Sequence, residues 1–194
     1  MVLKQSEGII LVTGPTGSGK TTTLYSLLSH IQEGGGRNIM TLEDPIERDF
    51  PGIRQTQINR LAGITFEQGL KTILRHDPDV IMLGEIRDKE TARIALESAY
   101  TGHLVLGTLH TSTCEGAVKR LQGLGVDSFL LEYCLKGIIC QRLIAKPCPH
   151  CHSRGCSQCL DQGVLGRELE TELIDWLEPL SRGAEKDMVK WGNY

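Results

Sequence analysis

The segment GPTGSGKTT, residues 14–22, has the residue types and the spacing of a phosphate-binding loop, G-x-x-x-x-G-K-[ST]. Small residues let successive backbone N–H groups turn toward the phosphates, and the following helix presents its positive N-terminal end to the same charge. We expect Lys20 to reach the β- and γ-phosphates and the Thr21 hydroxyl to bind Mg²⁺. The residues assigned to nucleotide binding are Gly14, Pro15, Thr16, Gly17, Ser18, Gly19, Lys20, Thr21 and Thr22.

A Gly-rich turn before an ordinary helix is the alternative interpretation of this segment. The apolar run GIILV before the loop is typical of a strand, and leucine and isoleucine recur after it with helical spacing. This strand–loop–helix context favours the phosphate-binding interpretation.

Carboxylates follow two other apolar runs. Glu85 stands just past VIMLG, where an acid can hold the hydration shell of Mg²⁺ or orient the attacking water. Glu43, Asp44 and Glu47 end another run, and Pro45 forces a turn there. Because strand carboxyl ends face the ligand crevice of a doubly wound sheet, we expect these acids to converge on one metal and one water. The alternatives are a strand-capping acid for Glu85 and a solvated acidic turn for the others.

Histidines and arginines add further candidates. His110, at the carboxyl end of an apolar run, is placed to sense or polarise a γ-phosphate, whereas His103 at the opposite end is expected to be structural. Arg75, Arg87 and Arg120 could stabilise charge on a transferred phosphoryl group within one subunit or from a neighbour, with surface solvation as the alternative. The candidate catalytic residues are Glu85, Glu43, His110 and Arg87.

Four of the seven cysteines form two C-x-x-C pairs, Cys148, Cys151, Cys156 and Cys159. Four thiolates in this arrangement predict a structural Zn²⁺ site. The spacer HSRG is short but contains Gly155, which can let the chain reverse, and His150 and His152 are reserve ligands. Four reduced free thiols are the alternative.

The elements that must position these residues follow from hydrophobic periodicity. Apolar runs of strand length alternate with segments of helical spacing, which predicts an α/β fold with a mainly parallel sheet. The expected strands are 9–12, 39–42, 80–83 and 104–106. Thr65 and Asp88 are expected to cap two helices. Residues 129–144 are predicted to form a buried apolar helix, and a Glu- and Leu-rich helix is expected after Gly166.

Composition limits the class of protein. The net charge of −3 and the pI near 6.1 argue against a nucleic-acid coat or a polybasic membrane anchor. No apolar run approaches the roughly 18 residues that span a bilayer, and the start lacks the features of a signal peptide. We therefore expect a cytosolic chain with no direct membrane insertion and no nucleic-acid partner. In a reducing compartment the scattered cysteines are expected to pack as small apolar side chains, namely Cys114, Cys134 and Cys140.

Four segments, in their order and spacing, resemble the four boxes of the bacterial ATPases that power type II secretion, type IV pilus assembly and DNA-uptake pseudopili. They are GPTGSGKTTTLYS, MTLEDPIE, LRHDPDVIMLGEIRD and TGHLVLGTLHT. The resemblance places Glu43 in the aspartate box, Glu85 in the Walker B box, and His103 and His110 in the histidine box. It leaves open whether Glu43 or Glu85 is the general base. RLIAKPCPHC resembles the tetracysteine insert of the export branch of this family.

The resemblance covers about residues 8–166 and implies a RecA-type core that uses ATP and Mg²⁺. It also implies a homo-hexameric ring at the cytoplasmic face of the inner membrane, where ATP hydrolysis drives a membrane platform protein. The expected division is a RecA-like ATPase core over 1–145, a zinc-binding insert over 146–166 and a short helical tail over 167–194.

Three features depart from the family pattern. The chain starts immediately before the phosphate-loop strand, Lys71 stands where an arginine is usual, and the cysteine pairs are only four residues apart. These departures suggest a truncated or fragmentary member that hydrolyses ATP weakly by itself. The alternative function is a non-hydrolytic assembly module, whereas the acidic balance disfavours a DNA-handling motor.

Overall fold

The computed structural model describes residues 5–176 and 189–191. Eight strands of this described part form one sheet, in the order β3-β2-β4-β5-β1-β6-β7-β8. Neighbours from β3 to β6 pair in parallel, whereas β6, β7 and β8 pair antiparallel. The strands are β1 Gly8–Thr13, β2 Ile39–Glu43, β3 Arg54–Gln57, β4 Val80–Leu83, β5 Leu104–Leu109, β6 Leu135–Pro147, β7 Val164–Asp175 and β8 Val189–Trp191.

The predicted α/β class and mainly parallel sheet are confirmed. The four strands expected from apolar runs are β1, β2, β4 and β5, and every residue in them is buried. Because helices or loops cover both faces, these strands carry apolar residues on both faces rather than on alternate positions. The edge strand β3 has the sequence RQTQ and is partly exposed, so it offered no apolar run to detect.

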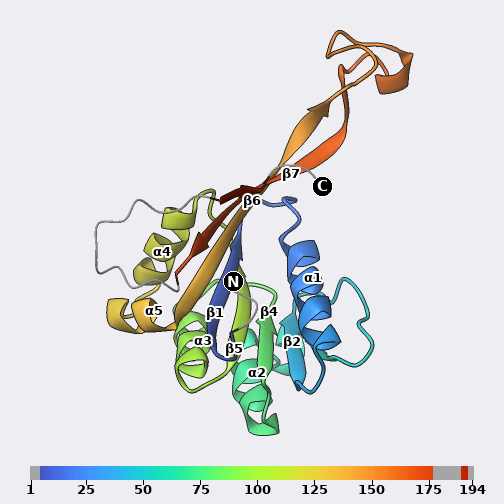
Figure 1. The fold of residues 1–194 in the computed structure, drawn as a ribbon. Helices are drawn as coiled ribbons and strands as arrows, with labels where there is room; N and C mark the ends of the chain where they lie inside the picture. Colours follow the sequence, from blue (N-terminus) through green and yellow to red (C-terminus); the bar gives the residue numbers. More distant parts are fainter. Residues whose placement is uncertain (1–4, 177–188, 192–194) are drawn as a thin grey trace.

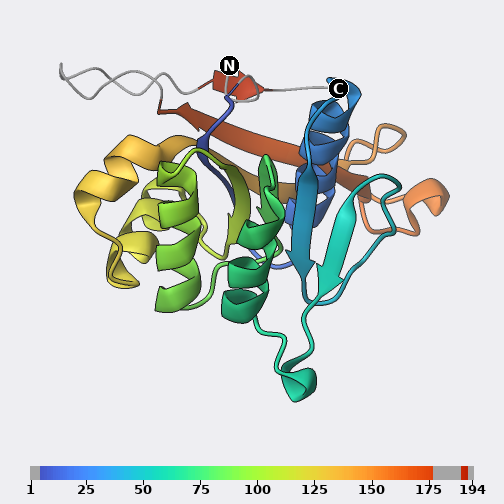
Figure 2. The ribbon, with the colours of Figure 1, turned by 90° about the horizontal axis from the view of Figure 1, so that it is seen from below.

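Helices cover the two faces of the sheet unequally (Figure 2). Side chains of α1 pack with Ile10 and Val12 of β1, whereas Ile9 and Leu11 face the side formed by α2 to α5. The helices are α1 Lys20–Glu33, α2 Phe66–Ile73, α3 Lys89–Tyr100, α4 Cys114–Gly123 and α5 Ser128–Cys134, with short 3₁₀ turns η2 Arg60–Ala62, η3 Leu74–His76 and η4 Ser157–Cys159. In the part of the chain that the structure describes, none of these helices has the length and apolar character needed to cross a membrane.

Both predicted helix caps are present. The Thr65 hydroxyl accepts a hydrogen bond of 3.2 Å from the Gln68 backbone N–H at the start of α2. The Asp88 carboxylate accepts one of 2.8 Å from the Thr91 backbone N–H at the start of α3. Each side chain satisfies an N–H group that the first helical turn leaves without a partner.

The prediction of one helix over 129–144 is wrong. Helix α5 ends at Cys134, and the chain continues as β6, which pairs in parallel with β1. Apolar periodicity cannot separate a buried helix from a fully buried strand. The β-branched pair Ile138 and Ile139 fits the strand, which lies inside the sheet between β1 and β7.

The helix expected after Gly166 is also wrong for the residues that the structure describes there. Strand β7, Val164–Asp175, runs antiparallel to β6. In its sequence ELETEL glutamate stands at every second position, and Leu169, Thr171 and Leu173 stand between, which is the period of a strand. Residues 177–188 and 192–194 of the expected tail lie outside the described part.

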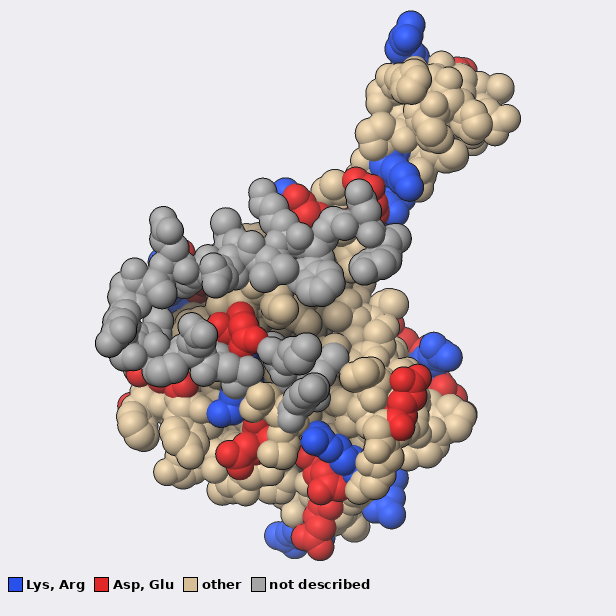
Figure 3. Space-filling view, in the orientation of Figure 1, with Lys and Arg blue, Asp and Glu red and all other residues tan. Residues whose placement is uncertain are grey.

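The outer half of the β6–β7 hairpin extends away from the helices and the rest of the sheet (Figure 1). Its two strands stay paired from Gly137–Asp175 out to Pro147–Val164. On the face seen in Figure 3, acidic and basic side chains are interspersed over the described core, and the hairpin end is mostly uncharged. The four clustered cysteines lie in the loop that closes this hairpin.

Cys114 and Cys140 form a disulfide, which corrects the expectation that both pack as free thiols. As a strand, β6 brings Cys140 beside the first residue of α4, with 5.6 Å between the two Cα atoms. Cys134 is a free, buried thiol as expected, and burial raises its pKa to about 11.

Candidate functional site

A cavity of about 500 Å³ lies where the phosphate loop meets the carboxyl ends of the parallel strands. The loop and α1 line one side, the turn after β2 and the residue after β4 line another, and β5 and β6 complete it. The polar and acidic residues that line it include Thr16, Lys20, Thr21, Thr22, Glu43, Asp44, Glu47, Glu85, Thr108 and His110. The fold therefore brings together the loop, both groups of acids and the histidine that the sequence singled out.

The loop has a backbone that glycine alone adopts easily at several points. Gly17 and Gly19 have φ angles of 75° and 87°. Gly14 packs against β6 so closely that a Cβ atom there would collide with the Gln141 carbonyl oxygen. Gly19 is the N-cap of α1, so the helix N-terminus opens directly into the cavity.

Lys20 lies inside the curve of the loop. Its ammonium group donates hydrogen bonds of 3.0 and 2.9 Å to the carbonyl oxygens of Gly14 and Pro15. Burial lowers the Lys20 pKa, and the negative charge of Glu85 acts in the opposite direction. The side chain is thus held by the loop and faces an acid across the cavity.

Glu85 connects the ends of two adjacent strands. Its Oε1 lies 3.2 Å from His110 Nε2, and its Oε2 lies 2.5 Å from Arg87 Nε. The Glu85 side chain is 16% exposed, whereas those of His110 and Arg87 are 42% and 55% exposed. Nearby, the Thr108 hydroxyl donates a 2.5 Å hydrogen bond to the Gly84 carbonyl, which ties the end of β5 to the residue before Glu85.

Glu43 is a buried carboxylate, 2% exposed, rather than part of a solvated turn. It accepts hydrogen bonds from the Tyr25 hydroxyl, from the Thr41 hydroxyl at 2.5 Å and from the Gln55 amide at 2.9 Å. Burial, with the hydrogen bond to Glu43, raises the Tyr25 pKa to about 12. Asp44, by contrast, is exposed at the rim of the cavity.

His103 lies away from the cavity and fits the structural role expected of it. Its Nδ1 is 2.9 Å from the Ser98 carbonyl oxygen, and its backbone N–H donates to the same oxygen. These contacts close the turn between α3 and β5.

Arg87 and the other candidate cations apart from Lys20 do not line the cavity of this chain. Lys71 pairs with Glu67 one turn earlier on the surface of α2, with 2.6 Å between Nζ and Oε1. Arg120 donates a 3.3 Å hydrogen bond to the Arg87 carbonyl, and Arg75 lies in the turn η3.

Several residues of this site carry no signal of that role in the sequence, among them Tyr25, Leu143 and Gln141. Tyr25 supports Glu43, Leu143 of β6 lines the cavity, and Gln141 of β6 binds the phosphate loop. Gln141 is an uncharged polar residue within an apolar run, but helical periodicity in that run does not place its side chain beside the loop. Nothing in the local sequence connects Tyr25 to Glu43, because they are joined only by the packing of α1 on the sheet.

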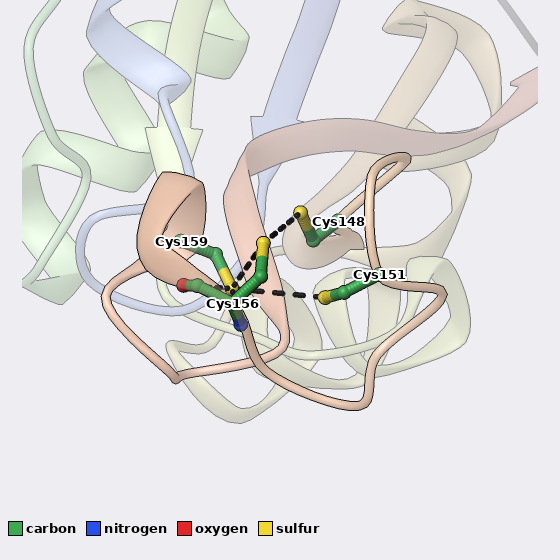
Figure 4. A group of neighbouring side chains, drawn as sticks. All are labelled: Cys148, Cys151, Cys156 and Cys159. Carbon is green, nitrogen blue, oxygen red and sulfur yellow. Dashed lines mark hydrogen bonds between the residues drawn. The ribbon is translucent and has the colours of Figure 1, made fainter.

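The four cysteines at the end of the hairpin converge (Figure 4). All four sulfur atoms lie within 4.8 Å of one another, and the separations Cys148–Cys156, Cys151–Cys159 and Cys156–Cys159 are 3.9, 3.8 and 3.8 Å. Zn–S bonds of about 2.3 Å place the corners of a tetrahedron ~3.8 Å apart, so the four sulfurs fit one zinc ion. His150 and His152 are outside this group.

The backbone supports the cysteine cluster. Gly155 has a φ of 90°, and a Cβ there would stand 3.0 Å from the Asp161 carbonyl oxygen. Burial acts to raise the Cys159 pKa, but hydrogen bonds from the backbone N–H groups of Cys156 and Gly163, with those of neighbouring thiols, lower it to about 7. These donors stabilise the thiolate, which is the form that binds a metal.

The family model described as "Type II/IV secretion system protein" matches residues 1–190. A putative type II secretion system protein E of Escherichia coli (strain K12) is 57% identical over 150 residues, which cover 77% of this chain and 30% of that protein. The type II secretion system ATPase E of Vibrio cholerae serotype O1 is 45% identical over 219 aligned positions, covering 97% of this chain and 43% of that protein.

Solved structures show the same fold. The pilus retraction motor PilT with bound ADP matches with a TM-score of 0.75 and 37% identity, over 90% of this chain and 49% of that one. The Legionella pneumophila ATPase DotB matches with a TM-score of 0.71 and 29% identity, over 91% of this chain and 47% of that one. This likeness confirms the expected fold class. The chain spans between 30% and 43% of the length of these two curated relatives.

Proposed function

Because the chain belongs to the type II/IV secretion system protein family, we propose that it binds Mg²⁺-ATP at its phosphate loop and hydrolyses it as part of a secretion or pilus motor. The observation that carries this proposal is a cavity that is lined by the loop, by acids from two strand ends and by His110. Within the full assembly we place the chain in a homo-hexamer at the cytoplasmic face of the inner membrane, acting on a platform protein.

The loop supplies the binding interactions. Its backbone N–H groups and the N-terminus of α1 would hold the phosphates, and Lys20 would exchange its bonds to two loop carbonyls for the β- and γ-phosphates. Thr21 and the acids lining the cavity are the hard oxygen donors that Mg²⁺ prefers, so this donor set fits the ion. When bound, Mg²⁺ would neutralise the charge developing on the phosphates.

Glu85 is our candidate for the general base. It lines the cavity, and its partners His110 and Arg87 are themselves partly exposed. In the proposed step Glu85 accepts a proton from water as the water oxygen bonds to the γ-phosphorus, and the bond to the β–γ bridging oxygen breaks to release ADP. His110 would orient Glu85, and Arg87 would be available to stabilise phosphoryl charge.

Glu43 has a different place in this proposal. Its carboxylate accepts three side-chain hydrogen bonds and is buried, so we assign it to fixing the turn that carries Asp44 and Glu47. The resemblance had left Glu43 and Glu85 as equal candidates for the base, and these contacts favour Glu85.

The end of the β6–β7 hairpin is proposed to hold one structural Zn²⁺ through Cys148, Cys151, Cys156 and Cys159. The sulfur separations support this proposal. The ion would fix the loop that closes the hairpin, as in other small Cys₄ sites.

The nucleotide proposal is tested with the Lys20→Ala variant, measuring Mg²⁺-ATP affinity and phosphate release. Lys119→Ala on the exposed surface of α4 is the matched control. Binding lost only in Lys20→Ala supports the proposal, and unchanged affinity in that variant refutes it. Binding without any turnover in the parent chain would favour the non-hydrolytic assembly module.

A further inference from the structure

Gln141 is a buried polar side chain in the middle of the sheet, 4% exposed. It follows Cys140 on β6, and Cys140 pairs with Thr13 at the end of β1. Gln141 therefore stands beside Gly14, the residue at which β1 becomes the phosphate loop. No part of the proposed catalytic step uses this residue.

The Gln141 amide bridges two parts of the nucleotide-binding segment. Its Nε2 donates a 2.7 Å hydrogen bond to the Ser18 carbonyl oxygen, and its Oε1 accepts a 2.8 Å hydrogen bond from the Thr23 hydroxyl. A Cβ atom on Gly19 would also lie 3.3 Å from Nε2. One side chain thus contacts the loop before its last glycine and reaches the first turn of α1.

The hydrogen bond to Ser18 has a consequence for the neighbouring peptide group. In a trans peptide, the carbonyl oxygen and the following N–H group point in opposite directions. When Gln141 holds the Ser18 oxygen toward β6, the N–H of Gly19 is directed to the other side, into the concave face of the loop. That face is where a phosphate-binding loop presents its N–H donors.

We propose that Gln141 is a positioning residue for nucleotide binding: it fixes the Ser18–Gly19 peptide and the start of α1 in the orientation that receives phosphate. This inference rests on the proposed nucleotide-binding function. Removing the amide should weaken binding more than it destabilises the fold. A purely structural role would instead predict a loss of stability at least as large as the loss of affinity.

The test compares substitutions that remove one or both hydrogen bonds with little change of volume. Gln141→Met removes both, Thr23→Val removes one, and Thr23→Ser keeps the hydroxyl. Gln122→Met, at an exposed position on α4, is the matched control. Mg²⁺-ATP affinity is measured by competition with a fluorescent ATP analogue, and thermal unfolding without nucleotide is followed in the same preparations.

We expect Gln141→Met to raise the dissociation constant about tenfold, because two hydrogen bonds of modest net value are lost. Thr23→Val should raise the dissociation constant by a factor of about three to five. Thr23→Ser keeps the hydroxyl and should have the same dissociation constant as the parent. In steady-state assays KM should rise while kcat changes little, since the bonds act on binding in the ground and transition states alike.

Parent-like affinity in both Gln141→Met and Thr23→Val would overturn the inference. If Gln141→Met does not fold, the Thr23 variants decide. Parent-like affinity in Thr23→Val overturns the inference. Weakened affinity in Thr23→Val together with parent-like affinity in Thr23→Ser supports the inference. A parent chain that binds no nucleotide would instead refute the proposed function, which keeps the two failures distinct.

Discussion

Glu85 and His110 meet across the carboxyl ends of β4 and β5, with Oε1 and Nε2 3.2 Å apart. Strands β4 and β5 pair in parallel up to Leu83 and Gly107, so the two side chains follow the last paired residues of neighbouring strands. The pairing of the two strands therefore fixes the backbone just before each of these two residues, and so brings their side chains together. This rigidity is what a carboxylate needs if it is to receive a proton from a positioned water.

The first prediction concerns Glu85→Gln. We expect phosphate release to fall about 10²- to 10⁴-fold while Mg²⁺-ATP affinity stays within a few-fold of the parent, because the amide cannot accept the proton. Steady-state phosphate release and equilibrium binding measure the two quantities. Glu97→Gln, on the exposed face of α3, is the control. Equal turnover in Glu85→Gln and the parent would exclude Glu85 as the base.

The second prediction uses the two histidines as a matched pair. His110→Gln should lower kcat by about tenfold, and it should have little further effect when Glu85→Gln is already present, because both act on one contact. His103→Gln should leave kcat unchanged, since His103 bonds Ser98 at the far end of β5. Fully additive effects in the double variant would show that His110 does not act through Glu85.

The third prediction is a pH dependence of stability. The Tyr25 pKa is raised to about 12 in the folded chain by burial and by the hydrogen bond to Glu43. The folded state therefore holds the phenol proton more tightly than the unfolded state, whose pKa is near the ordinary value of about 10. The resulting stabilisation is complete below about pH 10 and is lost as the pH rises toward 12.

The variant Tyr25→Phe isolates this contribution. At pH 7 it should lower the free energy of unfolding by about 1–3 kcal/mol, because Glu43 loses one of its buried donors. Between pH 10 and 12, stability should decline less steeply in Tyr25→Phe than in the parent. Denaturant unfolding of both proteins at several pH values from 7 to 12 measures this difference in stability. Parallel stability curves for the two proteins would contradict the assignment.

The fourth prediction is one zinc ion per chain. Metal analysis after purification without chelators should find it, and the Cys156→Ser, Cys159→Ser double variant should lose it. Cys134→Ala, which changes a buried thiol outside the cluster, should keep it. Because the cluster lies beyond the last pairing of the hairpin, Pro147–Val164, metal loss should leave Mg²⁺-ATP affinity within a few-fold of the parent. Parent protein without stoichiometric zinc would support free thiols instead.

The buried parallel strands and the glycine-rich loop between β1 and α1 could be predicted because their signals are local. A strand covered on both faces is continuously apolar, and the loop has glycines, a lysine and a threonine at fixed spacing. The acids Glu43 and Glu85 could be placed near the loop from a general rule about strand ends. These signals are enough to locate the cavity.

What could not be predicted depends on contacts between distant segments. Strand β6 is apolar enough to fit a helix or a strand, and only its place between β1 and β7 decides. The environment of Glu43 needs Tyr25 from α1 and Gln55 from β3, neither of which is marked in the sequence. The disulfide between Cys114 and Cys140 follows from the strand that was missed.

Strand β6 carries three kinds of contact along its length: Gln141 binds the phosphate loop, Leu143 lines the cavity, and Pro147 precedes the first cysteine of the cluster. Pro147 lies about 20 Å beyond Gln141 at the rise of an extended strand. Pairing with β7 makes this segment a two-stranded ribbon rather than a single flexible chain. If this ribbon tilts about the residues beside the phosphate loop, a small rotation there would displace the outer end of the hairpin by a larger distance.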